Sequence, residues 1–234
     1  MYFFQNILEI ILNLLFPPKC VGCKTYGSNF CAKCQEDIAF INAPLCHKCG
    51  YPHEVWKATC HKCAAYSLTF LDTIRSVAFF EGGSLRKAIH HFKYNNNQML
   101  ATDFAGLLTE CYMNNQLDSD VIVPVPLHKS RYKERGYNQS ELLSSYLSEL
   151  IERPIDNQTL IRHQKTVSQT TLSSKERKEN VMQAFKCKGN ALNGKSILLI
   201  DDVCTSGSTL EACAEALKLS GVHYVHALTI ARAS

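Results

Sequence analysis

The chain has 234 residues, of which 46% are hydrophobic, and its formal net charge at pH 7 is +4. This length fits one large domain or two unequal domains with a real apolar core, and the small charge excludes the strongly basic surface of a dedicated nucleic-acid-binding protein. Cysteine is concentrated near the N-terminus, because eight of the twelve cysteines lie between Cys20 and Cys63.

Residues 1–17 predict an amphipathic helix, since the polar residues Gln5, Glu9 and Asn13 recur every four positions in an apolar segment. The helix would pack on the body of the protein, or else on a membrane surface or a partner. The segment has neither the basic region nor the cleavage site of a signal peptide, and Glu9 interrupts it well short of the ~20 apolar residues of a membrane span. We therefore expect no membrane span and a cytoplasmic location, where thiols stay reduced.

Residues 18–68 carry four C-x-x-C pairs, which in a reducing compartment indicate metal binding rather than disulfides. Two such pairs supply the four sulfur ligands of tetrahedral zinc, whereas redox motifs and iron–sulfur clusters, the alternatives, fit this repeat less well. Sequential pairing predicts two structural Zn²⁺ ions, and an interleaved pairing stays open. In the sequential case one ion is bound by Cys20, Cys23, Cys31 and Cys34, and the other by Cys46, Cys49, Cys60 and Cys63.

Residues 69–234 alternate between apolar runs and helical periodicity. This order predicts an α/β domain with a parallel sheet and helices on both faces, preceded by the small zinc domain. Strands are expected over residues 121–125, 197–200 and 224–230, and helices over residues 83–94, 99–114, 138–152 and 208–220. Two of the helices would open with capping boxes, formed by Asn138 with Glu141 and by Ser208 with Glu211.

The run ILLIDDVCTSGSTL, residues 197–210, is the strongest candidate for a binding site. In open parallel sheets, ligands bind outside the carboxyl ends of strands, where Asp201 and Asp202 are expected. These acids would accept hydrogen bonds from two sugar hydroxyls, and the following turn and helix N-terminus would hold a phosphate, which together predict a ribose 5-phosphate site. An acidic cap beside an ordinary helix start and a metal-binding acid pair are the alternatives. The turn comprises Val203, Cys204, Thr205, Ser206, Gly207, Ser208 and Thr209.

The thiol of Cys204 stands out within this turn. A cysteine near a helix N-terminus can have a lowered pKa. We therefore expect Cys204 to be alkylated faster than Cys111 and Cys213, which fall on the apolar faces of helices and should be buried.

A dense basic cluster follows the strand expected at residues 121–125. It could neutralise the pyrophosphate of the same ligand, together with Mg²⁺ held largely by phosphate oxygens. It could equally bind a nucleic-acid backbone, with Tyr132 and Tyr137 as stacking surfaces, or form a solvated helix face. The cations are Lys129, Arg131, Lys133 and Arg135.

The motif LLIDDVCTSGST resembles the phosphoribosyl-diphosphate signature of type I phosphoribosyltransferases. Together with the C-x-x-C pairs, PVPLHKSRYKERGYNQ and RHQKTVSQTTLSSKERKENVMQAF extend the resemblance over nearly the whole chain, to the ComF family of competence proteins and its GntX relatives. The resemblance implies a phosphoribosyltransferase fold after a double zinc ribbon, with ribose bound by Asp201 and Asp202. It also implies a mobile hood that closes over the substrate and carries Arg162, Lys165, Gln169 and Arg177. Of these, Arg162, Lys165 and Arg177 are candidate catalytic residues. Lys93 is a further family position.

Two functions follow from these expectations. The first is a Mg²⁺-dependent enzyme that transfers the ribose 5-phosphate group from phosphoribosyl diphosphate to a nitrogen nucleophile. The second is a non-catalytic module that uses the same fold to handle single-stranded DNA, together with DNA-uptake proteins, in natural competence. Pro124 and Pro126 bear on the choice, because they stand where transferases with known substrates carry a glycine and a basic residue.

Overall fold

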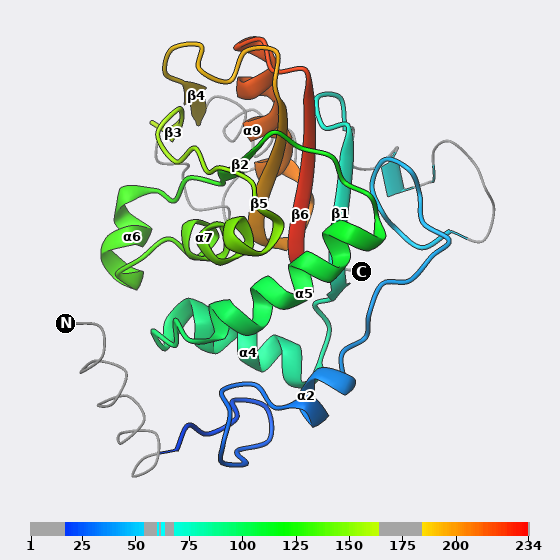
Figure 1. The fold of residues 1–234 in the computed structure, drawn as a ribbon, viewed down its shortest axis with the longest axis vertical. Helices are drawn as coiled ribbons and strands as arrows, with labels where there is room; N and C mark the ends of the chain where they lie inside the picture. Colours follow the sequence, from blue (N-terminus) through cyan, green and yellow to red (C-terminus); the bar gives the residue numbers. More distant parts are fainter. Residues whose placement is uncertain (1–16, 54–59, 61, 64–67, 164–183, 234) are drawn as a thin grey trace, which may run out of the picture.

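A computed structural model of the chain describes residues 17–53, 60, 62–63, 68–163 and 184–233 (Figure 1). The helix expected over residues 1–17 therefore lies outside the described residues except for its last position. Three of the four predicted hood residues, Lys165, Gln169 and Arg177, also lie outside them. Within the described part of the chain, every helix is too short or too polar to span a bilayer.

Four parallel strands form the central sheet, as predicted. Their order across the sheet is β1-β6-β5-β2, so the strand that carries the two aspartates lies between two neighbours. Because the pairing is parallel, the carboxyl ends of all four strands meet at one edge. The strands are β1 (Thr73–Phe79), β2 (Val121–Pro124), β5 (Ser196–Cys204) and β6 (Tyr224–Arg232).

Helices cover both faces of this sheet, which explains why β5 begins with an uninterrupted apolar run. Leu198 and Ile200 pack against one helical layer, whereas Ile197 and Leu199 point to the opposite face and belong to the core that includes α9. The first layer contains α4 (Gly83–Tyr94), α5 (Leu100–Asn114) and α7 (Gln139–Ile151), and the opposite face is covered by α9 (Ser208–Leu219) (Figure 1).

Several elements differ from the sequence-based expectations. Strand β5 runs on past residue 200 and includes both aspartates, because it stays paired with β6 as far as Cys204. Some elements were not expected from the sequence: strand β1, the antiparallel hairpin of β3 (Leu160–Arg162) with β4 (Phe185–Cys187), and the short helices α2 (Ala32–Glu36) and α6 (Lys129–Arg135).

Neither predicted capping box forms. Asn138 does cap α7, but its side chain accepts a hydrogen bond from the backbone N–H of Ser140. Helix α9 begins after Gly207, which has a left-handed backbone and provides no side-chain cap. The carboxylate of Glu211 instead accepts hydrogen bonds from a segment far away in the sequence.

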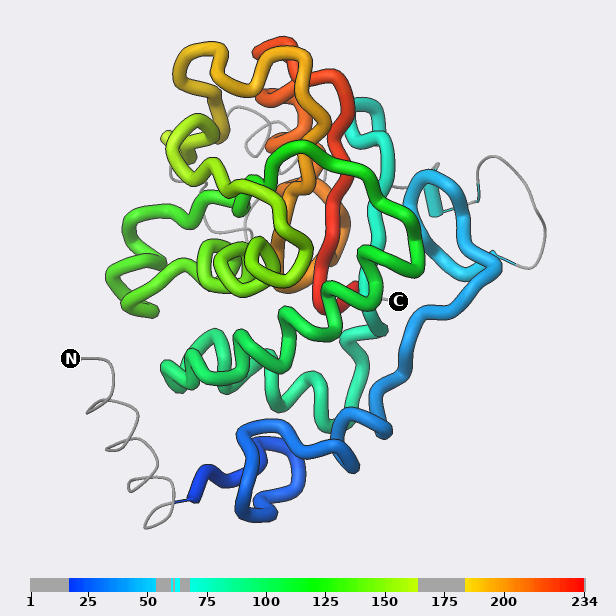
Figure 2. Tube along the Cα trace, viewed as in Figure 1, coloured from blue at the N-terminus to red at the C-terminus, as the bar shows by residue number. Residues whose placement is uncertain are grey.

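The two halves of the cysteine-rich segment pack in different places. The first half lies against α4 and α5, where the ring of Phe30 meets that of Phe104 edge to face at 6.3 Å. The second half lies beside β1, because the backbone N–H of Ile74 donates to the carbonyl of Lys48. Figure 2 shows this course, with the chain running from beneath α4 and α5 up the side of the molecule toward β1.

Candidate functional site

The eight N-terminal cysteines form two separate groups of four. Within each group all sulfur atoms lie within 4.8 Å of one another, and the grouping follows the sequential pairing rather than the interleaved one. Sulfur atoms of neighbouring pairs are 3.4 to 3.6 Å apart, close to the ~3.8 Å that Zn–S bonds of ~2.3 Å would give in a tetrahedron. Both groups therefore have the donor set and spacing of a structural zinc site, in which no ligand position is left for water.

The two aspartates lie at the carboxyl end of β5, in different surroundings. Asp201 accepts hydrogen bonds from the hydroxyl of Ser140 at 3.0 Å and from the backbone N–H of Asp202 at 2.9 Å. Asp202 forms an ion pair with Lys93 of α4, with the ammonium nitrogen 2.8 Å from a carboxylate oxygen. Because Asp202 is only 7% exposed, this lysine compensates a charge that is almost fully buried.

The pKa of Asp201 is raised to about 7. Burial is the main cause, and the neighbouring charge of Asp202 adds to it, whereas Lys93 and Ser140 oppose the rise. An empty site would therefore hold Asp201 partly protonated at neutral pH. Such a shift, next to a charged partner and in a cleft, is typical of functional sites.

A cavity of about 310 Å³ opens in front of the two aspartates. It brings together groups from six elements and the loops between them, although they are far apart in the sequence. Arg131 and Arg135 of α6 contribute positive charge opposite the acids, whereas Lys129 and Lys133 are exposed and line no part of this cavity. Its other polar or charged lining residues are Lys93, Asn138, Gln139, Ser140, Arg162, Asp201, Asp202, Thr205 and Thr209.

The turn after β5 has the backbone shape expected of an anion-binding loop. Gly207 has a φ of +73°, a backbone conformation that residues other than glycine rarely adopt, and it leads directly into α9. The hydroxyls of Ser206 and Ser208 lie 2.8 Å apart and are exposed to incoming groups. Thr205 and Thr209 line the cavity itself.

Cys204 does not behave as the sequence analysis expected. Its side chain is only 3% exposed, and burial raises the pKa of the thiol to about 11 instead of lowering it. Cys111, which we expected to be buried, is partly exposed. The strand pairing of Cys204 with Arg232 explains the difference, because it turns the thiol into the core rather than toward the helix N-terminus.

Arg162 is the described member of the predicted hood residues. It ends β3, lines the cavity, and stacks over the ring of Phe185 at 5.2 Å. Burial and the charge of Arg131 lower the pKa of its guanidinium, while the charge of Asp201 opposes this shift. The hairpin thus brings one predicted cation to the same cavity as the acids.

Some polar side chains around the acids were not predicted from the sequence. Ser140 and Gln139 open α7 and line the cavity, and Gln139 accepts a hydrogen bond from Arg135 at 2.8 Å. Their position directly after the basic cluster was a signal that could have pointed to them. Tyr137, expected as a stacking surface, is instead buried and donates to the carbonyl of Phe92.

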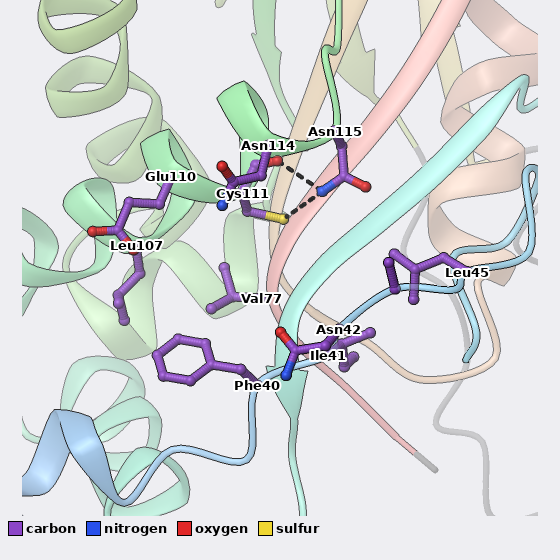
Figure 3. A pocket seen from close by; sticks show the side chains of 11 residues that line it. Phe40, Ile41, Asn42, Leu45, Val77, Leu107, Glu110, Cys111, Asn114 and Asn115 are labelled. Carbon is purple, nitrogen blue, oxygen red and sulfur yellow. Dashed lines mark hydrogen bonds between the residues drawn. The ribbon is translucent and has the colours of Figure 1, made fainter. Parts of the chain in front are cut away.

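A second cavity, of about 160 Å³, lies between residues 40–45, β1 and α5 (Figure 3). It shares no lining residue with the cavity at the acids. The side-chain amide of Asn115 points toward Cys111 and donates to its carbonyl at 2.9 Å (Figure 3). Its oxygen accepts from Arg75 at 2.7 Å. The nitrogen and the oxygen of the Asn115 amide therefore both have hydrogen-bond partners within the protein.

Comparisons with known proteins agree with this architecture. A double zinc ribbon domain matches residues 11–64, and a phosphoribosyl transferase domain matches residues 93–234. Competence protein F of Haemophilus influenzae is 30% identical over 226 residues, covering 92% of this chain and 97% of its own. Competence protein ComFC of Bacillus subtilis is 29% identical over 202 residues, covering 82% and 78%. DNA utilization protein YhgH of Escherichia coli O6:H1 is 28% identical over 209 residues, covering 86% and 89%.

Proposed function

The chain belongs to the ComF family, whose double zinc ribbon precedes a phosphoribosyl transferase domain, and on this premise we propose that it binds phosphoribosyl diphosphate in the cavity at Asp201. One observation carries the proposal. A single cavity of about 310 Å³ is lined or bordered by three groups that the sequence had indicated as candidates. These groups are the acid pair, the turn over residues 203–209, and the cations Arg131, Arg135 and Arg162.

The two ends of the ligand would meet different chemistry. Asp201 and Asp202 would accept hydrogen bonds from the ribose hydroxyls, since an ionised carboxylate accepts hydrogen bonds only. The 5-phosphate would bind the backbone N–H groups around Gly207 at the start of α9, with added hydroxyl donors from Thr205 and Thr209. The proposed loop also includes Val203, Cys204, Ser206 and Ser208, and Cys204 would contribute only its backbone because its thiol is buried.

The pyrophosphate would face the positive side of the cavity. Arg131 and Arg135 have the planar donor groups that bind phosphate oxygens in pairs, and Arg162 adds a third guanidinium. Of the two nearby carboxylates, that of Asp202 is already paired with Lys93. Mg²⁺ would therefore be held largely by phosphate oxygens, where it neutralises charge on the leaving group.

These contacts support a displacement at the anomeric carbon. A nitrogen nucleophile would form the new bond to this carbon as the bond to the pyrophosphate oxygen breaks, and pyrophosphate would leave with the bonding electrons. The arginines would stabilise negative charge on the leaving group, and the acids and the turn would fix the ribose. Lys165 and Arg177, which lie outside the described residues, would add charge from the hood.

The competing proposal is a module that binds single-stranded DNA with the same fold. Tyr94 and Tyr132 favour it, because they are 56% and 49% exposed and lie beside the basic cluster. The guanidinium of Arg135 stacks over the ring of Tyr94 at 5.1 Å. A cationic groove with exposed aromatic rings is the usual surface for single strands.

A single pair of measurements separates the two functions. Pyrophosphate release is followed with phosphoribosyl diphosphate, Mg²⁺ and a panel of bases and amines, and single-strand binding is measured at several salt concentrations. Release with any acceptor supports the enzyme. No release, together with single-strand binding that weakens steeply with salt, supports the module.

The relatives are named for competence and for DNA utilization. We propose that this chain likewise has a role in DNA uptake and that it is located in the cytoplasm. We also propose three parts of the chain: an N-terminal helix over residues 1–17, the double zinc ribbon over residues 18–68 and the transferase-like domain over residues 69–234. Deletion of the gene should reduce transformation by external DNA while leaving growth on rich medium unchanged.

A further inference from the structure

The two cysteine groups pack on different sides of the sheet. Cys20 and Cys34 of the first group share an apolar core with α4, α5 and α7. All four cysteines of the second group share a core with α9 and with Cys204, the last residue of β5. The second group therefore belongs to the same packed unit as the turn over residues 205–209.

Glu211 forms the first link between that turn and the second group. It lies on the first turn of α9, is only 4% exposed, and accepts three backbone hydrogen bonds. The donors are the N–H groups of Thr69 at 2.5 Å, Phe70 at 2.8 Å and Leu71 at 3.2 Å. This segment follows the last cysteine of the second group by six residues, so the carboxylate ties the start of α9 to the chain directly after the zinc ribbon.

Arg232 forms the second link. It ends β6, where it pairs in register with Cys204, and its side chain is 1% exposed. Its guanidinium donates to the backbone carbonyl of Cys49, a cysteine of the second group. This buried arginine joins the metal-binding turn to the end of β6, which pairs with the end of β5 next to the loop.

The loop itself rests on the same elements. A side-chain carbon added at Gly207 would lie 3.6 Å from Leu68 and 3.8 Å from Ile74, so the loop backbone is packed against the linker and β1. The second group is in turn seated on β1, since Arg75 donates to the carbonyl of His47 at 3.2 Å. Leu68 and Ile74, which pack against the turn over residues 205–209 at Gly207, thus share one apolar core with the second cysteine group.

We propose that the second cysteine group, through Glu211 and Arg232, holds the turn over residues 205–209 in position. Loss of metal from the second group would then release this turn, whereas loss of metal from the first group would not. Glu211 and Arg232 are positioning residues in this scheme. The consequence for ligand rests on the proposed function, because a released turn would bind the 5-phosphate less well. Binding would then depend on metal supply to the zinc ribbon.

The first group provides the contrast. Its contacts run to the N-terminal part of α4, where the hydroxyl of Ser84 donates to the carbonyl of Cys34 at 2.5 Å. This point is on the opposite side of the sheet from α9. Loss of the first metal should loosen α4 and α5 without exposing Cys204.

The test compares Cys63→Ser with Cys23→Ser in the full chain. Each variant should lose one of the two zinc ions, as measured by metal analysis. Alkylation of Cys204 with iodoacetamide, followed by peptide mass mapping, reports opening of the turn without any ligand. We expect Cys204 to react at least about tenfold faster in Cys63→Ser, and within about twofold of wild type in Cys23→Ser, because only the first change removes the support of the turn. Equal rates in the two variants would overturn the proposal.

Glu211→Gln tests the link with both metals retained. The amide loses one acceptor oxygen and turns donors toward backbone N–H groups, so the turn should open although zinc content stays at two ions per chain. We expect at least about tenfold faster alkylation of Cys204, against an unchanged rate in the control Glu215→Gln one turn along the same helix. A wild-type rate in Glu211→Gln would overturn the role of this residue, even if Cys63→Ser failed to fold.

Affinity for phosphoribosyl diphosphate separates this inference from the proposed function. If wild type binds the compound, Glu211→Gln should weaken binding by at least about tenfold, and unchanged affinity would refute the effect on ligand. If wild type shows no binding while Cys204 still reacts faster in Glu211→Gln, the proposed function fails and the mechanical coupling stands.

Discussion

Replacing Asp201 by asparagine should make the protein more stable at neutral pH. The carboxylate is the charged form, and burial together with the charge of Asp202 raises its pKa to about 7. In the unfolded chain the same group would ionise near pH 4. Folding at neutral pH therefore includes the free-energy cost of burying this charge beside Asp202. The neutral amide of Asp201→Asn avoids that cost.

The size of the effect follows from linkage. Because the folded state binds the proton more tightly, the free energy of unfolding falls as pH rises from about 4 to about 7 and then levels off. A pKa raised from about 4 to about 7 corresponds to at most ~4 kcal/mol, since one pKa unit is worth ~1.36 kcal/mol. Asparagine keeps an oxygen that can accept from both Ser140 and the N–H of Asp202, but its amide group lacks the second carboxylate oxygen, so we expect a net gain of about 1–3 kcal/mol.

Thermal unfolding at two pH values measures this gain. Asp201→Asn should melt several degrees above wild type at about pH 8, at ~2–4 °C per kcal/mol for a chain of this size. The difference should be smaller at about pH 6 by about 1 kcal/mol, because wild type then keeps its proton. Both pH values leave the cysteine ligands of zinc in their binding range.

Asp156→Asn is the matched control. Burial alone would raise the pKa of Asp156, but hydrogen bonds from Thr159 and Gln158 outweigh it and lower the pKa. Its stabilising contribution is therefore complete above about pH 4, and its loss should cost ~1 kcal/mol equally at both pH values. A melting temperature of Asp201→Asn at or below that of wild type at about pH 8 would refute the reasoning about the buried charge.

Three further predictions concern other parts of the molecule. Gly50→Ala should lower the melting temperature by several degrees, because the added carbon would lie 2.4 Å from a carbonyl oxygen of β1. Gly82 has a similar φ but open space around it, so Gly82→Ala should lower the melting temperature less in the same assay. The double variant Arg131→Glu/Arg135→Glu should weaken phosphoribosyl diphosphate binding at least about tenfold in a thermal-shift titration, and Lys133→Glu, outside the cavity, should change it less than about twofold. A strong chelator should unfold the cysteine-rich segment, because structural zinc contributes ~10–16 kcal/mol to the stability of such domains. Limited proteolysis before and after chelation measures this unfolding. An unchanged digestion pattern would contradict a structural role for the metal.

The sequence predicted what depends on local spacing. The C-x-x-C pairs indicated two zinc sites because a two-residue spacer is a short-range constraint. The apolar run that ends in Asp201 and Asp202 indicated a strand covered on both faces, and the small residues after it indicated a ligand-binding turn. These expectations needed only neighbours in the chain.

The sequence could not predict what depends on distant contacts. Glu211 fits a local capping box, but the structure turns it toward three backbone N–H groups of residues 69–71, which nothing near it in sequence reveals. Cys204 has the position of a reactive thiol, yet its pairing with Arg232 buries it and raises its pKa. Strand β1 was missed because its burial comes from β6 on one side and from the zinc ribbon on the other.

Calorimetry with phosphoribosyl diphosphate and Mg²⁺ tests the central claim most directly, using wild type and the double variant Asp201→Asn/Asp202→Asn. Both proteins should contain two zinc ions per chain. The account predicts saturable heat at one site per chain for wild type and none for the double variant. No heat from wild type, or equal heat from both proteins, would contradict a ribose phosphate site at the end of β5.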